Sequence, residues 1–159
     1  MCIRDRGNRE LRTRLTRVAE AMLDTSPLGH SIANSFLTVT EDNFDSEGRP
    51  AWAGLSPVTL ARRKSGKKLF QSGQLRRSIT TRVSDNEVEI GTNDPKAPTQ
   101  HFGAKQGQYG KSSRNGPLPW GDIPARPFLP MDEQGNLQHE AELAIFDDVD
   151  HYWHQLFNF

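Results

Sequence analysis

The sequence predicts an α+β fold in which a small antiparallel sheet, built on a β-hairpin, packs against N-terminal helices and a C-terminal helix. Residues 79–90 alternate apolar and polar side chains on both sides of Ser84-Asp85-Asn86, which is typical of two strands joined by a short Asp/Asn turn. Apolar residues recur at helical spacing near both ends of the chain. With 159 residues, the chain is long enough for one domain with a core of its own.

Three helices are predicted before the hairpin. Residues 10–24 carry one apolar stripe, Leu11, Leu15, Val18 and Met22, at spacings of four, three and four. Two further helices begin at Ser-Pro pairs, because Ser caps a helix start and Pro suits the first helical position. The first begins at residues 26–27 and ends in a turn at 45–50, and the second runs from residues 56–57 to about 63. The buried side of the longer one is marked by Ile32, Phe36, Val39 and Phe44.

The chain after the hairpin is predicted to contain a long loop, one strand and one helix. Residues 103–121 are rich in Gly, Ser and Lys, and we expect this loop to be mobile in the free protein and ordered by a neighbour. Residues 124–129 are predicted to form an edge strand, since prolines cannot donate hydrogen bonds to a central ladder. The helix spans residues 137–156 and has an acidic outer face. Its apolar stripe is formed by Ile145, Val149, Trp153 and Leu156.

The charges are balanced overall but unevenly distributed along the chain. The formal net charge is zero, yet residues 1–80 carry 14 basic and 8 acidic side chains, and residues 81–159 carry 6 and 12. A protomer with one basic and one acidic half can associate head to tail. Two alternatives are that these charges only solvate helix surfaces, or that a basic N-terminal half serves a small nucleic-acid-binding module.

Residues suited to catalysis or metal binding are few. Cys2 is the sole cysteine, so neither an internal disulfide nor a cysteine-based metal cluster can form. His151 and His154 lie three residues apart near acidic residues, which leaves a small metal-dependent hydrolase as an alternative to solvated polar side chains. His101 has no nucleophile-type turn to accompany it as a general base. We therefore expect a protein without enzyme activity, cofactor or metal.

The N-terminal residues give no sign of targeting to a membrane. Residues 1–8 match no helix start, and we interpret them as a disordered or spurious leader that precedes a single domain over residues 9–159. The first 25 residues are Arg-rich and lack the apolar centre of a secretory signal. No run approaches the ~18 apolar residues of a membrane span. We expect synthesis in the cytoplasm.

Several short motifs follow one another in an order that resembles a known family. They are Trp52-x-x-Leu55-Ser56-x-x-Thr59-Leu60, Leu69-x-x-Ser72-Gly73-x-Leu75-x-x-Ser78-Ile79, Val88-x-Ile90-Gly91, His101-Phe102-Gly103 and Ile123-Pro124-Ala125-Arg126-Pro127-Phe128-Leu129. Over about residues 10–157, this order resembles the tail-completion and virion-morphogenesis proteins of long-tailed bacteriophages, of the P2 tail completion protein S and Mu morphogenesis protein G type.

The resemblance implies a structural part of the virion. Such proteins complete the head-proximal end of the tail and enable head-tail joining at the neck, and they are similar to proteins that assemble as rings, commonly sixfold. The implied partners are further copies of the chain, the tail tube or terminator, and the head connector. No membrane, cofactor or activity is implied, and contact with nucleic acid would be incidental. The protein would occur in the host cytoplasm during assembly and then in the virion.

The motifs also give individual residues expected roles. Core positions are expected for Trp52, Leu55, Leu69, Leu75, Ile79 and Phe128, and turn positions for Gly73, Gly91 and Gly103. Other structural motif residues are Thr59, Ser78, His101, Phe102, Pro127 and Leu129. Arg126 is expected to make a fixed ion pair or hydrogen bond at an interface. Segments 64–68 and 103–121 should face partners through Arg62, Arg63, Lys64, Lys67, Lys68, Lys105, Lys111, Arg114 and Arg126.

Overall fold

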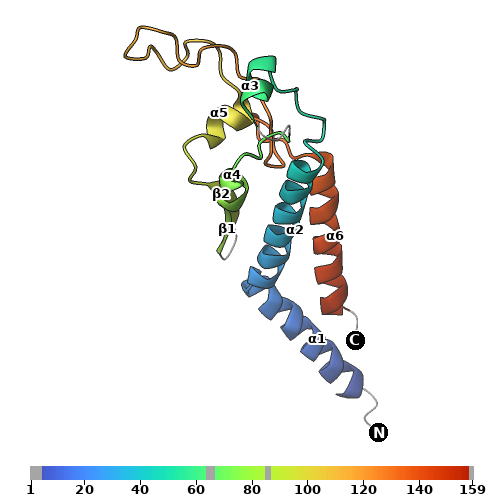
Figure 1. The fold of residues 1–159 in the computed structure, drawn as a ribbon. Helices are drawn as coiled ribbons and strands as arrows, with labels where there is room; N and C mark the ends of the chain where they lie inside the picture. The colour runs from blue at the N-terminus through green and yellow to red at the C-terminus, as the bar shows by residue number, and fades with distance from the viewer. Residues whose placement is uncertain (1–4, 64–66, 85–86, 158–159) are drawn as a thin grey trace.

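The structure is a computed structural model that describes residues 5–63, 67–84 and 87–157, with side chains from residue 8 onward. Its elements are α1 (Asp5–Leu23), α2 (Ser26–Asp45), α3 (Pro57–Arg62), α4 (Gln74–Arg77), β1 (Ile79–Ser84), β2 (Glu87–Thr92), α5 (Ala97–Phe102) and α6 (His139–Phe157). Figure 1 shows α2 and α6 side by side, with α1 projecting at one end of the molecule and the 103–121 loop at the other. The predicted α+β class, with helices from both termini beside a small antiparallel sheet, is confirmed.

Helix α2 is the centre of the fold because it packs against both the hairpin and α6. Phe36 and Val39 are buried in one cluster with Ala141 of α6. Gly29 allows the hairpin to approach closely, since a Cβ atom there would lie 2.7 Å from Val83 Cγ1. The prediction of which side of α2 is buried is confirmed, because Phe36, Val39 and Phe44 are buried and Ile32 is partly buried.

A second cluster, mostly aromatic, lies where α2 ends. Phe44 meets the ring of Trp52 edge-on at 5.9 Å between centroids and the ring of Phe128 at 5.5 Å. Ala97 of α5 completes the buried set. Trp52 and Phe128 are thus core residues. Leu69, Leu75, Ile79 and Leu129 are partly buried against them, whereas Leu55 is half-buried in a groove described below.

The hairpin has the register that its alternation predicts. Ile79 lies opposite Thr92, and Val83 lies opposite Val88. Val88 and Ile90 pack against the α2–α6 cluster, so one face of the sheet is covered by helix. The expected turn at residues 85–86 lies outside the described residues, and the two strands on either side of it are confirmed.

The predicted edge strand over residues 124–129 is wrong. This segment is extended, but the described part of the chain forms one sheet of two strands, and the nearest pairing is an isolated bridge between Ala104 and Ile123. Its prolines lack N–H groups, and two of its remaining donors bond to α5 instead of a strand. The Arg126 N–H donates to the Gln100 carbonyl at 2.9 Å, and the Phe128 N–H donates to His101 Nδ1 at 3.3 Å.

Buried Asn43 joins three segments that are distant in sequence. Its Nδ2 donates to the Phe128 carbonyl at 3.3 Å and to Gln138 Oε1 at 2.8 Å. Its Oδ1 accepts a hydrogen bond from Arg49 Nε at 3.1 Å. A buried amide is stable when both ends are bonded in this way. Asn43 therefore fixes the C-terminal half of α2 against the extended segment and the start of α6.

Other boundaries differ from expectation for local reasons. Helix α1 begins at Asp5, so residues 5–8 are helical, while residues 1–4 lie outside the described part. Ser26 does not cap α2, because Thr25 is the N-cap residue and the Ser26 N–H donates to Asp24 Oδ1 at 3.0 Å. Ser56 does cap α3 by accepting from the Thr59 N–H. Helices α4 and α5 were not expected, since four and six residues are too few for a periodic signal.

Candidate protein-binding interface

Arg126 is held inside the chain rather than presented at its surface. Its side chain is buried, with Nε donating to the Ala53 carbonyl at 3.2 Å and Nη2 to the Gly54 carbonyl at 3.0 Å. Burial lowers the pKa of Arg126, and the nearby Arg63 guanidinium lowers it further. In residues 5–63, 67–84 and 87–157, no carboxylate forms an ion pair with Arg126. The expected fixed hydrogen bond is therefore made to the segment that follows Trp52 in the same chain.

His101 is a structural histidine with both ring nitrogens in use. Nδ1 accepts the Phe128 N–H, and Nε2 lies 3.2 Å from the Met131 carbonyl, so the neutral ring carries its proton on Nε2. Burial lowers the pKa of His101. The ring also meets Phe102 and Phe128 edge-on at 4.5 and 5.1 Å. This geometry fixes α5 to the extended segment and leaves no nitrogen for general base chemistry.

The remaining motif residues serve the fold in several ways. Trp52 Nε1 donates to the Pro127 carbonyl at 2.9 Å, and the hydroxyls of Ser78 and Thr92 are hydrogen-bonded across the base of the hairpin. Gly73 has a left-handed backbone, with φ of 70°, where α4 begins. The turn expected at Gly91 is wrong, because Gly91 lies within β2 opposite Thr80. Gly103 and Phe102 end α5, and Phe102 is exposed.

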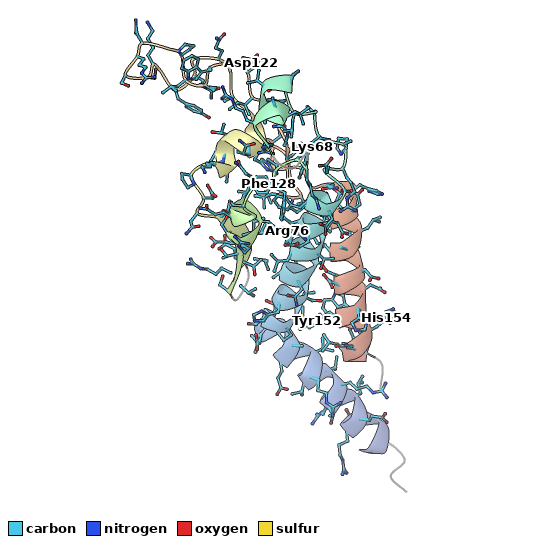
Figure 2. All side chains as sticks on the ribbon, viewed as in Figure 1. Lys68, Arg76, Asp122, Phe128, Tyr152 and His154 are labelled. Atoms are coloured by element: carbon cyan, nitrogen blue, oxygen red, sulfur yellow. The ribbon has the colours of Figure 1, made fainter. Side chains whose placement is uncertain are left out.

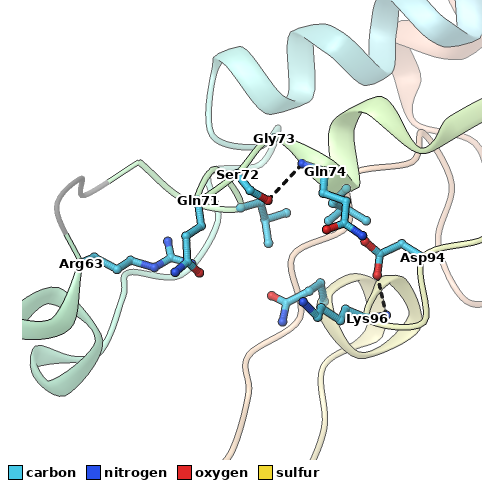
Figure 3. Close-up of a pocket in the computed structure, with 10 residues that line it drawn as sticks. Arg63, Gln71, Ser72, Gly73, Gln74, Asp94 and Lys96 are labelled. Atoms are coloured by element: carbon cyan, nitrogen blue, oxygen red, sulfur yellow. Dashed lines mark hydrogen bonds between the residues drawn. The ribbon is translucent and has the colours of Figure 1, made fainter.

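Motif residues from distant parts of the chain meet around a surface groove. A groove of about 530 Å³ is lined by Leu55, Thr59 and Arg126 together with residues of α3 and α5. A smaller hollow of about 160 Å³ shares Arg63, Leu69 and Gln100 with it, as well as containing Gly73, Leu75 and Lys96 (Figure 3). The two hollows are adjacent, and their charged lining contains both cations and the carboxylates of Asp94 and Asp122.

Several of the cations expected to face a partner form ion pairs with carboxylates of the same chain. Lys67 pairs with Asp45 at 3.5 Å, and Lys68 pairs with Glu47 at 3.4 Å. Lys105 pairs with Asp122 at 3.3 Å. Lys64 lies outside the described residues. Four others, Arg62, Arg63, Lys111 and Arg114, form no ion pair with a carboxylate of the described residues.

Arg76 organises the acidic end of α2. Its guanidinium binds Asp45 at 2.7 Å and also pairs with Glu41 (Figure 2). A hydrogen bond from Arg76 holds the pKa of Asp45 below its usual value, and the Lys68 backbone N–H does the same for Glu47. Lys67, Lys68 and Arg76 are thus paired with carboxylates at or just after the end of α2. Fewer cations remain for a partner than the sequence suggests.

The 103–121 loop is folded back on itself. The Tyr109 N–H donates to the Leu118 carbonyl and the Ser112 N–H to the Gly116 carbonyl, both at 2.8 Å. Gly103 closes its base with φ of 79°, at a position where a Cβ atom would lie 2.7 Å from the Ile123 carbonyl oxygen. The loop exposes the cations Lys111 and Arg114 and the aromatic rings of Tyr109 and Trp120.

Two helix faces expose apolar side chains that the sequence reasoning did not assign to a surface. On α1, Leu11 and Leu15 are 55% and 59% exposed. On α6, Leu143 and Phe146 are 55% and 71% exposed, because Ala141, Ala144 and Ile145 take the core-facing side. Exposed apolar groups gathered on one face mark interaction surfaces. The signal was present in the sequence as further apolar residues on the side of α6 next to the expected stripe.

The alternative of a metal site is not supported by the geometry of α6. His154 Nε2 lies 3.3 Å from Asp150, while His151 is bonded to Gln155 on another side of the helix. Within the described residues, no group of three or more His, Cys, Asp or Glu side chains could hold a metal ion. A search of the same residues for a helix able to cross a membrane found none.

Comparison with known proteins gives a consistent result. The profile of the phage virion morphogenesis family matches residues 7–153. A relative from Haemophilus influenzae, named Mu-like prophage FluMu G protein 2, is 33% identical over 147 residues, which cover 92% of this chain and 91% of that protein. No solved structure matches the chain significantly.

Proposed function

Because this chain belongs to the phage virion morphogenesis family, we propose that it completes the head-proximal end of a phage tail and thereby enables head-tail joining. It acts as a structural protein through protein–protein contacts in a closed ring, commonly of six copies. Its partners are further copies of itself, the tail tube or terminator, and the head connector. It assembles in the host cytoplasm and remains in the virion at the neck.

The observation that carries this proposal is the placement of exposed apolar and charged groups on three separate surfaces, two of them basic and one acidic. These surfaces are α1, the outer side of α6, and the 103–121 loop. Figure 1 shows α1 and the loop at opposite ends of the molecule. A ring subunit needs one surface for each of its two neighbours and another for the structure on which the ring sits. Three separate surfaces meet that requirement.

The loop is best suited to the axial contact with the tail or the connector. Tyr109 and Trp120 provide large apolar contact areas at a low entropic cost, and Lys111 and Arg114 provide charge at the tip. The closed base at Gly103 fixes the direction in which the loop leaves the domain. The mechanism is geometric, since the protein contributes shape and complementary surfaces and no bond-making step.

The test is complementation in a phage that carries this gene. An amber mutation is expected to give filled heads and separate tails in negative stain, and purified wild-type protein added to that lysate should restore infectious particles. A triple variant, Lys111→Ala with Arg114→Ala and Trp120→Ala, should restore far fewer. The control Arg82→Ala changes an exposed cation of the hairpin and should restore titre fully. Joined particles in the amber lysate would refute the proposal.

The loop also offers a specific reason to test nucleic-acid binding. Aromatic rings beside cations can stack on bases and contact phosphates, and both types occur in this loop at Tyr109, Lys111, Arg114 and Trp120. Filter binding of single-stranded DNA at two salt concentrations separates the possibilities. Tight binding that falls steeply with salt and is lost in the triple variant would favour the nucleic-acid module. Weak binding unaffected by that variant would leave the assembly role.

A further inference from the structure

Helix α1 carries an apolar seam that the rest of the chain leaves open. The α1 seam consists of Leu11, Leu15, Val18 and Met22, at the four-three-four spacing of coiled-coil core positions. Leu11, Leu15 and Met22 are each more than half exposed, and Val18 is partly buried. Heptad spacing places Arg12 and Arg14 at positions that flank this seam, and Arg14 also pairs with Glu10 of the same helix at 2.6 Å.

Helix α6 carries a matching seam on its outer side. The α6 seam consists of Leu143, Phe146, Asp150, Trp153 and Phe157, at spacings of three, four, three and four. Leu143, Phe146 and Phe157 are more than half exposed, and the rings of Trp153 and Phe157 stack at 5.8 Å. The flanking positions are occupied by Glu142 and Asp147 in the N-terminal half of the seam, and by Val149, His154 and Leu156 beyond it.

The two seams are not covered by one another within a single chain. Figure 1 shows that α1 and α6 meet near the C-terminal end of α6 and diverge from there. At this junction the hydroxyl of Tyr152, which is labelled in Figure 2, donates a hydrogen bond to the Ala21 carbonyl at 3.1 Å. Leu11 lies about three helical turns from Ala21, at roughly 1.5 Å of rise per residue, and is exposed. Each seam is therefore available to another molecule.

We propose that the α1 seam of one copy docks along the α6 seam of a neighbouring copy as a two-helix, coiled-coil-like contact. Arg12 and Arg14 would then face Glu142 and Asp147, and opposite charges at flanking positions select the partner and its orientation. Asp150, which pairs with His154 of its own helix at 3.3 Å, is the one charged position of the α6 seam. In the ring of the proposed function, this would be the lateral contact between neighbouring copies. That role rests on the proposed function.

Charge favours this occupant over the others. A symmetric pair of α1 helices would place arginines against arginines, and a symmetric pair of α6 helices would place carboxylates against carboxylates. Helix α6 contains five acidic residues, all between residues 140 and 150, and no Lys or Arg, so its charge is opposite to that of the arginine-rich α1. Nucleic acid or an anionic membrane could bind the arginines of α1 but would leave the apolar groups of α6 in water. Because each copy uses a different surface toward each neighbour, the contact is heterologous and can close into a ring.

Charge reversal tests the contact in the full chain by sedimentation or by size exclusion with light scattering. The wild type is expected to self-associate. The α1 variant Arg12→Glu/Arg14→Glu and the α6 variant Glu142→Lys/Asp147→Lys should each associate at least about 10-fold more weakly, and the protein carrying all four changes should recover to within about threefold. Circular dichroism must show helix content unchanged in every variant.

Matched changes make the outcome decisive. Arg9→Glu/Arg17→Glu alters the net charge equally at positions away from the seam, so it should associate like the wild type. The proposal is overturned if the wild type remains monomeric at its solubility limit or if the charge-reversed variants associate as strongly as the wild type. It is also overturned if the protein carrying all four substitutions does not regain self-association. Binding of α1 to anionic vesicles or DNA without self-association also overturns it. Self-association through these seams without restored titre in the complementation assay would instead refute the proposed function alone.

Discussion

His101 provides the sharpest test of how the extended segment is held. The substitution His101→Phe keeps an aromatic ring against Phe128 and removes both ring nitrogens. The Phe128 N–H, in a residue that is 1% exposed, then loses its acceptor, while the half-buried Met131 carbonyl can bind water. A buried unsatisfied N–H costs about 1–3 kcal/mol. With the weaker loss at Met131, we expect the free energy of unfolding to fall by about 2–3 kcal/mol.

The same substitution should change the pH dependence of stability. The folded pKa of His101 is lowered by burial, so between that value and the unfolded pKa of about 6.5 the unfolded chain binds more protons. The contribution of neutral His101 to the free energy of unfolding is therefore fully present above the unfolded pKa. It is lost as the pH falls toward the folded pKa. From about pH 7.5 to about pH 5.5 the largest loss that one such group can cause is about 1.4 kcal/mol. His101→Phe should remove this component.

Urea unfolding at these two pH values measures both effects. His101→Asn is the matched control, because its amide oxygen can occupy the place of Nδ1 without titrating. It should recover about 1 kcal/mol of the loss at neutral pH and show the same weaker pH dependence as the Phe variant. If the wild type and His101→Phe lose stability equally between the two pH values, the buried neutral histidine is the wrong description. If His101→Phe is as stable as the wild type at neutral pH, the hydrogen bond to Phe128 contributes nothing.

Three further substitutions test other contacts that hold the fold. Gly103→Ala should cost about 2 kcal/mol or more in thermal unfolding, because its Cβ would meet a carbonyl oxygen at 2.7 Å, whereas Gly121→Ala, with no atom within 4 Å, should be neutral. Asn43→Leu should lower the urea-derived free energy of unfolding by about 2–4 kcal/mol, since its buried partners lose their bonds. Arg76→Ala should lower the free energy of unfolding by about 0.5–1.5 kcal/mol, and by less in high salt. Arg82→Ala, whose ion pair is exposed, should leave it almost unchanged. Equal losses in the two variants would contradict this ranking.

Elements with a long periodic pattern could be predicted from the sequence. The alternation in residues 79–90 located the hairpin, and apolar spacing located α2 and its buried side. Family motifs marked Trp52 and Phe128, which are buried together. These predictions succeeded because neighbouring residues carry the information, through a repeat of two for a strand and 3.6 for a helix.

Features that depend on distant partners could not be predicted in the same way. The prolines of residues 124–129 indicated correctly that no central strand could form there, but nothing nearby showed that α5 would supply the acceptors. The amide of Asn43 bonds to residues 85 and 95 positions away. The sequence suggests that Lys67 and Lys68 are free cations, but the fold places Asp45 of α2 and Glu47, which follows α2, against them. In each case the missing information is a tertiary contact rather than a local pattern.

The charge asymmetry of the sequence becomes more specific once these internal pairs are known. Lys67, Lys68 and Arg76 pair with carboxylates at or just after the end of α2, so these three cations contribute little to the outward charge of the N-terminal half. Helix α1 is rich in arginine, and one of these residues, Arg14, pairs with Glu10 of the same helix at 2.6 Å. Helix α6 is acidic and contains no Lys or Arg. These two helices also carry the open apolar seams. Charge and apolar surface therefore coincide on the same two elements, which is the arrangement that a head-to-tail protein contact requires.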